Sequence, residues 1–302
     1  MEWSRSSYSQ CLSILVLALC LSSLFITSHA QATSVRALEG QFNKWTPNNL
    51  KFSKDGRGVE LVLDKYSAAG MGSKRSWLYG GFGAWIQLPA GNSAGTVTTL
   101  YMTSPGPHHC ELDFEFLGNQ TGEPFLLHTN VFVDGVGGRE QQIYLGFDPS
   151  AAFHYYNFQW NKDLIVFYVD NTPVRMFRNL EGIVPRFKYP NHQAMGLFLS
   201  IWDGSSWATQ GGRVKLDWIA APFVATYQKF RLNGCVVESY DSDGIRKCQN
   251  TMWAAPGPNA QRLPTGRVRQ MRAVRQNQVK YNYCDDRKRY PSAPPECAYN
   301  VL

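Results

Sequence analysis

The segment from His109 to Asn119 alternates strictly between acidic and large apolar side chains. Its acidic residues are Glu111, Asp113 and Glu115, and each is followed by an apolar residue, Leu112, Phe114 or Phe116. Because neighbouring side chains point to opposite faces of a β-strand, this pattern predicts a strand with one core face and one face that displays three carboxylates. The chain must therefore build a sheet that has one side covered by a second layer.

Short β-strands are indicated over most of the chain, from about Phe42 to Tyr227. Gly, Pro, Asn and Asp interrupt this region about every ten residues, and helical periodicity is scarce. The best strand candidates are Val59–Leu63, Gly83–Leu88, Gly95–Tyr101, Leu164–Val169 and Ala194–Ser200. Asp170–Pro173 contains turn-forming residues and is predicted to join two strands. These features predict an all-β, two-sheet sandwich over residues 31–225.

The first thirty residues have the pattern of a signal peptide. Arg5 supplies a positive charge, an apolar run extends from Cys11 to Ile26, and Ser28 to Ala30 offers small residues for cleavage. A retained membrane anchor is the alternative, but the run is short for a bilayer span and has no basic flank behind it. We therefore expect a secreted protein that has no membrane segment after cleavage.

Four of the cysteines that follow the leader form two local pairs of equal spacing, Cys235 with Cys248 and Cys284 with Cys297. In an oxidising compartment they predict two disulfides that staple a loop-rich extension over residues 226–302. Four cysteines allow three connectivities, and a zinc site is a further alternative that lacks a C-x-x-C spacing. Cys110 is left over as a buried thiol.

The extension is basic and contains one expected helix. From residue 226 onward there are 13 Lys/Arg and 6 Asp/Glu, which accounts for the whole net charge of +7. Pro264–Tyr283 can form an amphipathic helix with Val268, Met271, Val274 and Val279 on its apolar side. The charge indicates either a solvated surface or retention on an acidic polymer such as wall pectin. Nucleic acid is a poor partner for a secreted protein.

The carboxylates suggest hydrolytic chemistry on sugars. Glu111 and Glu115 are four residues apart, so their Cα atoms lie about 13 Å apart on a strand, and their side chains can approach the roughly 5–5.5 Å of retaining glycosidases. One glutamate would attack the anomeric carbon and the other would act as acid and base, while Asp113 holds the nucleophile. A wider, inverting pair and a merely solvated acidic strand are the alternatives. The chain is also rich in aromatic residues, at 14%, which serve either as sugar-stacking platforms or as core.

This strand resembles that of glycoside hydrolase family sixteen, specifically the plant xyloglucan endotransglucosylase/hydrolases. The family's catalytic strand reads H-D-E-I-D-F-E-F-L-G, where this chain has His109-Cys110-Glu111-Leu112-Asp113-Phe114-Glu115-Phe116-Leu117-Gly118. The resemblance implies that Glu111 is the nucleophile, Glu115 the acid/base and Asp113 the helper. It also implies glycosylation at Asn119, which begins the sequon Asn119-Gln120-Thr121.

Other segments extend the resemblance to nearly the whole chain after the leader. They include Ser73–Ser76, Ser93–Val97, Arg139–Gln142, Phe147–Pro149, Trp207–Gly212, Ala221–Phe223, Tyr281–Asp286 and Glu296–Cys297. The family implies a concanavalin-like jelly-roll sandwich with an open cleft across its concave sheet. The implied substrate-binding residues are His128, Thr129, Asn130, Gly138, Arg139, Glu140, Ser206, Trp207, Gly211 and Arg289.

The chain departs from the family pattern at four positions. Cys110, Gly138 and Ser206 replace the usual Asp, Asn and Asp, and Gly146 replaces a Trp. Cys110 has the parity of the core face, so we expect the carboxylate chemistry to survive. The other three changes bear on cleft binding and substrate preference.

The expected function is retaining cleavage of the β-1,4-glucan backbone of xyloglucan, followed by transfer of the donor to another xyloglucan chain in the cell wall or apoplast. A mainly hydrolytic xyloglucanase and a non-catalytic wall-glucan-binding protein are the alternatives. No cofactor and no metal site are expected, since the adjacent His108 and His109 face opposite sides of a strand and make a poor metal pair.

Overall fold

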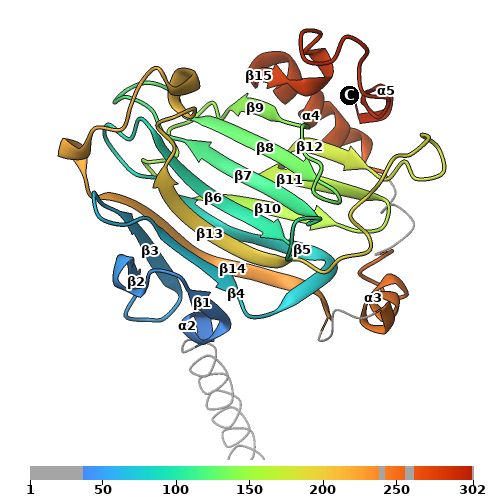
Figure 1. Ribbon diagram of the computed structural model, residues 1–302, viewed down its shortest axis with the longest axis horizontal. Helices are drawn as coiled ribbons and strands as arrows, with labels where there is room; N and C mark the ends of the chain where they lie inside the picture. Colours follow the sequence, from blue (N-terminus) through green and yellow to red (C-terminus); the bar gives the residue numbers. More distant parts are fainter. Residues whose placement is uncertain (1–36, 238–241, 256–261, 301–302) are drawn as a thin grey trace, which may run out of the picture.

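The computed structural model describes residues 37–237, 242–255 and 262–300. Two antiparallel sheets of eight and seven strands face each other, and Figure 1 shows the larger sheet in front of the smaller one. The predicted all-β sandwich is confirmed. The expected signal peptide at residues 1–30 lies outside the described residues. Among the described residues, no helix has the length and apolar character needed to cross a membrane.

The larger sheet carries the acidic strand near its middle. Its strands, in spatial order, are β1 (Phe42–Lys44), β4 (Ala69–Ser73), β13 (Gly196–Asp203), β6 (Thr96–Thr103), β7 (Glu111–Leu117), β8 (Leu126–Phe132), β9 (Gln141–Tyr144) and β15 (Val279–Asn282). Because β7 has paired neighbours on both sides, its outward side chains form the floor of the sheet's concave face.

The smaller sheet covers the other side of the larger one. Its strands, in spatial order, are β12 (Thr172–Arg178), β11 (Leu164–Val169), β10 (His154–Trp160), β5 (Ser76–Gln87), β14 (Phe223–Val237), β3 (Gly58–Leu63) and β2 (Leu50–Phe52). The helical segments are α2 (Ala37–Gln41), α3 (Ser242–Gln249), α4 (Thr265–Gln278) and α5 (Cys297–Asn300), with short 3-10 turns η1 (Pro47–Asn49), η2 (Thr209–Gly212), η3 (Trp218–Ala220) and η4 (Tyr283–Asp285).

The aromatic residues of β7 form part of the core between the sheets. The ring of Phe114 lies 4.7 Å from that of Phe158, and the ring of Phe116 lies 4.6 Å from that of Tyr156. All four side chains are fully buried, and burying such a side chain contributes about 1.5–3 kcal/mol. The predicted alternation of β7 is therefore confirmed, because its apolar side chains pack against the second sheet.

The other local predictions hold with small shifts in their boundaries. All five strand candidates fall within or across observed strands. Asp170 and Asn171 have φ values of 46° and 63°, so they form the two-residue turn with positive φ that joins β11 to β12.

The C-terminal extension is stapled as expected. Disulfides join Cys235 to Cys248 and Cys284 to Cys297, each with Cα atoms 5.6 Å apart. The expected helix is confirmed over Thr265–Gln278, with Met271 and Val274 buried. Val279 was wrongly assigned to that helix, because the chain turns extended there and pairs with β9 as β15.

The boundary between sandwich and extension is crossed by one long strand. β14 runs from Phe223 to Val237 and pairs with both β3 and β5, so it continues past residue 226. The division at 225/226 stays a prediction.

Candidate active site

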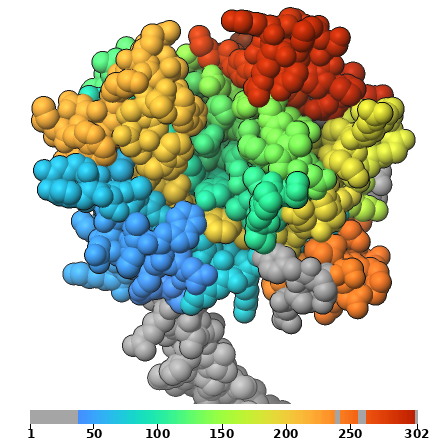
Figure 2. Space-filling view, in the orientation of Figure 1, coloured from blue at the N-terminus to red at the C-terminus, as the bar shows by residue number. Residues whose placement is uncertain are grey.

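Three carboxylates stand in a row on the outward face of β7 and line one open cleft. The cleft has a volume of about 340 Å³. Its other lining residues come from the strands on either side of β7 and are Thr99, Tyr101, Asn130, Phe132, Ser200 and Trp202. Figure 2 shows this face hollowed over the green strands, between the gold loop after β13 and the red C-terminal extension. Glu111, Asp113 and Glu115 therefore share one substrate-sized groove.

Asp113 is the buried member of the row, at 6% exposure. Burial, followed by the charges of Glu111 and Glu115, raises the pKa of this carboxyl well above its ordinary value. A protonated Asp113 can donate the hydrogen bond that it shares with Glu111. The helper role expected for Asp113 thus rests on its proton rather than on its charge.

Glu115 has the properties of a proton donor at neutral pH. Burial, assisted by the charges of Glu111 and Glu140, raises the pKa of Glu115 to about 7. A carboxyl group in this range is protonated in weakly acidic solution and can still release its proton, which suits an acid that later acts as a base. The environment therefore separates Glu115 from an ordinary surface glutamate.

His128 lies beside Glu115 without forming an ion pair. Its Nε2 atom is 3.6 Å from Glu115 Oε2, but burial lowers the pKa of His128 to about 4, so the imidazole is neutral in weakly acidic and neutral solution. The Nε2-protonated tautomer is assigned because Gln142 Nε2 donates to His128 Nδ1 at 3.2 Å. His128 therefore presents an N–H group toward the acid/base candidate.

An aromatic platform, Trp45, Phe198 and Tyr101, lies on the concave sheet. The ring of Phe198 stacks on Trp45 at 5.8 Å and on Tyr101 at 5.3 Å. Glycines beneath make this possible, since a Cβ at Gly70 would lie 2.3 Å from the Trp45 ring and a Cβ at Gly72 would lie 2.3 Å from the Phe198 ring. Aromatic faces of this kind hold sugar rings by stacking.

Sequence reasoning missed this platform. Phe198 and Ser200 are two positions apart on one predicted strand, so their side chains are expected on the same face of the sheet. This spacing was a usable signal. The position of Tyr101 opposite Asp113 depends on the pairing of β6 with β7, which the sequence does not give.

Comparison with known proteins identifies the family. The model of "Glycosyl hydrolases family 16" matches residues 39–220, and that of "Xyloglucan endo-transglycosylase (XET) C-terminus" matches residues 247–297. A Populus tremula x Populus tremuloides protein named xyloglucan endotransglucosylase protein 34 is 45% identical over 253 residues, 84% of each chain. An Arabidopsis thaliana protein named probable xyloglucan endotransglucosylase/hydrolase protein 5 is 41% identical over 293 residues, 97% of each chain.

This chain belongs to glycosyl hydrolase family 16 and to its xyloglucan endotransglucosylase/hydrolase group.

Solved structures agree on the fold. A Bacillus licheniformis β-glucanase is 24% identical with a TM-score of 0.50, and the match covers 65% of this chain and 92% of the glucanase. The Crh5 transglycosylase in complex with NAG is 20% identical with a TM-score of 0.54, covering 71% of this chain and 89% of the transglycosylase.

In this family 16 member, two of the expected contacts on β8 face the cleft and one does not. His128 and Asn130 lie opposite Glu115 and Asp113 across the strand pair. Thr129, between them, is fully buried, and its hydroxyl group accepts a hydrogen bond from Arg175 Nη1 at 2.9 Å. Thr129 therefore acts on the cleft only through the backbone.

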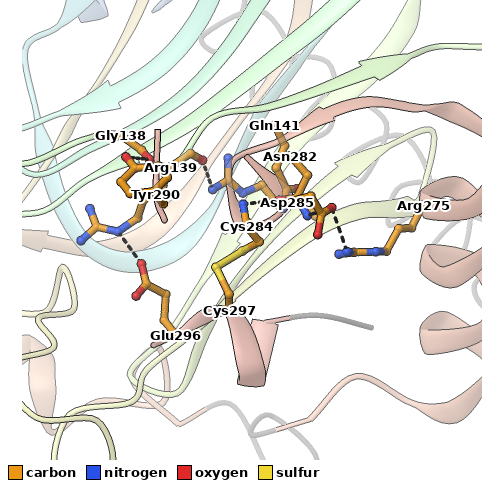
Figure 3. The surroundings of a disulfide bond; sticks show 11 residues. Gly138, Arg139, Gln141, Arg275, Asn282, Cys284, Asp285, Tyr290, Glu296 and Cys297 are labelled. Atoms are coloured by element: carbon orange, nitrogen blue, oxygen red, sulfur yellow. Dashed lines mark hydrogen bonds and ion pairs between the residues drawn. A yellow bond between two sulfur atoms is a disulfide. The ribbon is translucent and has the colours of Figure 1, made fainter. Parts of the chain in front are cut away.

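Arg139 is turned toward Glu296 of the C-terminal extension (Figure 3). Its Nε atom lies 3.3 Å from Glu296 Oε1, beside the disulfide between Cys284 and Cys297. Its Nη1 atom donates to the carbonyl oxygens of Val131 and Val136 at 3.2 and 2.7 Å. These contacts make Arg139 a link between the cleft edge and the extension.

Gly138, Glu140 and Arg289 join the same cleft edge to the extension. Arg289 Nη1 donates to Glu140 Oε2 at 2.7 Å. Tyr290 Oη donates to the carbonyl of Gly138 at 2.8 Å, and a Cβ at Gly138, where φ is +83°, would lie 2.7 Å from that hydroxyl. The glycine at this position thus allows the extension to approach closely.

The remaining expected residues lie on the loop after β13. Trp207 is partly buried, with its ring 5.6 Å from His128 and 6.2 Å from Trp202. Ser206 and Gly211 are exposed on the same loop. Trp207 therefore lies near the Glu115 end of the cleft, while Tyr101 of the platform lies level with Asp113.

Three further positions have clear local surroundings. Cys110 is a buried free thiol, whose pKa burial raises to about 11, and it faces away from the carboxylates as expected. Gly146 has φ of +74°, and a Cβ there would lie 3.2 Å from Gln278 at the end of α4. Asn119 lies on the loop after β7, where its Nδ2 atom donates to the carbonyl of Pro124 at 2.9 Å.

Proposed function

We propose that this protein cleaves the β-1,4-glucan backbone of xyloglucan and transfers the cleaved chain to a second xyloglucan. Glu111 attacks the anomeric carbon, Glu115 protonates the leaving oxygen, and Asp113 holds Glu111 by its hydrogen bond. The observation that carries the proposal is the single groove shared by the three carboxylates, in which the pKa of Glu115 lies near 7. The names of the relatives support the choice of substrate.

Transfer requires a groove that continues on both sides of the reacting bond. Water resolves a glycosyl-enzyme unless a sugar hydroxyl is bound and oriented better than water. Aromatic rings line the groove at different levels along the strands: Tyr101 and Phe198 are level with Asp113, and Trp202 is level with Leu117. Trp207 lies beside His128, whose ring is 5.6 Å away. They supply stacking surfaces for donor and acceptor, and His128, Asn130, Glu140 and Arg289 supply polar contacts nearby.

The test follows two products at once. The purified protein is incubated with xyloglucan and a fluorescent xyloglucan oligosaccharide, and both label incorporation and new reducing ends are measured. We expect label to enter the polymer without new reducing ends. New reducing ends without label would instead establish a hydrolase, and neither signal, with polymer still bound, would establish a binding protein.

Two variants separate chemistry from folding. Glu111→Gln should abolish label incorporation, while Glu123→Gln, on the exposed loop after β7, should retain it. Full activity of Glu111→Gln would disprove the assigned nucleophile, provided that both variants unfold cooperatively.

We also propose that the protein is secreted to the apoplast and carries a glycan on Asn119. The amino-terminal pattern and the two disulfides support secretion. Expression in plant cells should deliver a protein that begins after Ala30 and loses mass on enzymatic removal of N-glycans. Asn119→Gln should abolish that loss of mass, and an unchanged loss would assign the glycan elsewhere.

A third proposal concerns the basic extension, which we expect to bind acidic polysaccharide. Helix α4 contains Arg267, Arg269, Arg272 and Arg275 and no acidic residue. Arg269 and Arg272 are exposed, so they can approach a polyanion. The protein should bind polygalacturonate at low salt and elute as salt rises, and Arg269→Gln with Arg272→Gln should elute earlier. Identical elution of both proteins would contradict this proposal.

A further inference from the structure

Cys110, Asp134 and His192 come together beside the start of the strand that carries Glu111. Cys110 immediately precedes β7, Asp134 follows β8, and His192 lies in the connection between β12 and β13. One ligand atom from each residue lies within 4.8 Å of the other two. His192 Nε2 lies 2.7 Å from Asp134 Oδ1. The fold thus collects a sulfur, a nitrogen and an oxygen donor that no sequence spacing connects.

Hydrogen bonds hold the segments that carry these three ligand residues in position. The N–H of Cys110 donates to Ser104 Oγ at 2.8 Å, and the N–H of Ser104 donates to the carbonyl of Cys110 at 3.0 Å. Gln193, next to His192, donates from Nε2 to the carbonyl of His108 at 2.9 Å and accepts a hydrogen bond from Ser104. The segments that carry Cys110 and His192 are therefore joined by one network.

The third donor is anchored to the same segment. Gly135, next to Asp134, donates from its N–H to the carbonyl of His109 at 2.8 Å. Asp134 itself has φ of 54°, a conformation that aspartate adopts more readily than most residues. All three donors are therefore tied to residues 104–110, so little ordering is needed for a ligand to bind.

The donor set suits zinc. Thiolate, imidazole and carboxylate are the ligands of Zn²⁺, at about 2.3, 2.0 and 2.0–2.2 Å, whereas Ca²⁺ and Mg²⁺ favour oxygen donors alone. Tetrahedral ligands at these distances are separated by about 3.3–3.7 Å. The Asp134–His192 contact at 2.7 Å must therefore open by about 0.6 Å, and a donor pair near the 4.8 Å limit must close by about 1 Å. Three protein ligands leave a fourth position for water.

An ion can reach this position from solvent. The side chains of His192 and Asp134 are 39% and 40% exposed, while Cys110 is buried beneath them. Asp134 also borders an open pocket of about 310 Å³. The soft ligand is therefore at the base of the site, and the two harder ligands are at its entrance.

We propose that Cys110, Asp134 and His192 bind one Zn²⁺ ion, which fixes the β12–β13 connection to the start of β7. The Cys110 thiol loses its proton to solvent when the Zn–S bond forms, so binding strengthens as pH rises. No electron transfer is involved. This site lies outside the proposed chemistry and does not depend on it.

The experiment measures metal binding rather than activity. The purified protein, with its disulfides intact, is freed of metal by a chelator and titrated with Co²⁺, whose thiolate complexes absorb in the near ultraviolet, and then with Zn²⁺. We expect one equivalent of Co²⁺ to produce this absorption, one equivalent of Zn²⁺ to remove it, and Zn²⁺ to raise the midpoint of thermal unfolding by several degrees.

Three variants decide the assignment. Cys110→Ser should remove the thiolate absorption, and His192→Ala, at an exposed position, should weaken Zn²⁺ binding by about 100-fold or more. His154→Ala is the matched control, because His154 also pairs with an aspartate, Asp170, and should leave binding unchanged. Absence of the absorption in the parent protein would overturn the proposal, as would equal Zn²⁺ affinity of the parent protein and His192→Ala.

Discussion

The guanidinium group of Arg175 reaches across the sandwich and donates from Nη2 to the backbone carbonyl of Arg139 at 2.6 Å. Arg175 belongs to β12 of the smaller sheet, whereas Arg139 lies in the connection between β8 and β9 of the larger sheet. The guanidinium also packs over the Phe167 ring at 5.3 Å. Burial lowers the pKa of Arg175 to about 10, so the group keeps its charge at neutral pH. One buried cation thus fixes the backbone beneath the expected substrate contacts.

Arg175→Met should destabilise the protein by about 2–4 kcal/mol. The substitution keeps the volume of the side chain but leaves the Thr129 hydroxyl and the Arg139 carbonyl without their buried donor. Urea unfolding measures the effect. Arg272→Met, on the exposed face of α4, is the matched control and should change stability by less than about 0.5 kcal/mol. Equal stability of the two variants would show that the buried hydrogen bonds contribute nothing.

The transfer rate should be highest below about pH 7 and fall as pH rises through that value. In the proposed first step Glu115 donates a proton, and its pKa is raised to about 7, mainly by burial. Glu140 contributes to this shift through its negative charge. Glu140→Gln should therefore move the falling limb to lower pH, which a series of label-transfer rates would detect. A shift to higher pH would contradict the assignment.

Glu115→Gln should gain stability relative to the parent protein as pH rises from about 4.5 to 7. The pKa of Glu115 is raised in the folded state, so folding binds a proton in this window, and the parent protein loses stability as pH increases through it. The variant lacks this titration and should be more stable by about 1–3 kcal/mol at pH 8. Urea midpoints at pH 4.5 and 8 measure the difference. Glu123→Gln, which is exposed, should instead follow the parent at both values.

Phe198→Ala should weaken xyloglucan binding more than it slows the chemical step. Phe198 is the middle ring of the aromatic platform, so its loss separates Trp45 from Tyr101. We expect KM to rise about 3–10-fold with a smaller change in kcat. Gly72→Ala should act in the same direction, since its methyl group would displace the Phe198 ring. Tyr66→Ala, at a highly exposed position outside the cleft lining, serves as the control.

The sequence predicted what depends on near neighbours. The parity of Glu111, Asp113 and Glu115 follows from strand geometry alone, and both disulfide pairs are local. Parity also argued against Thr129 as a cleft residue, because its neighbours His128 and Asn130 share the opposite face. The family resemblance implies Thr129 because it rests on the whole segment His128-Thr129-Asn130, without regard to the face that each side chain takes.

Long-range packing accounts for what the sequence did not show. The side chain of Arg139 is directed by Glu296, which lies 157 residues further along the chain. The pairing of Tyr101 with Asp113 requires the strand register. Cys110, Asp134 and His192 lie close together only because three loops, before β7, after β8 and between β12 and β13, end at the same place. None of these relationships produces a periodic pattern in the amino-acid sequence.

β15 places the extension at the edge of the larger sheet. An exposed sheet edge offers unpaired N–H and C=O groups to any other chain, and such edges promote aggregation. Here the four residues of β15 pair with β9, so that side of the catalytic sheet is occupied by the protein's own backbone. A chain cut before residue 279 would keep all three carboxylates but expose the edge of β9. The last part of the chain thus replaces the edge of β9 by that of a four-residue strand, and a short edge strand is a poorer template for pairing with another chain.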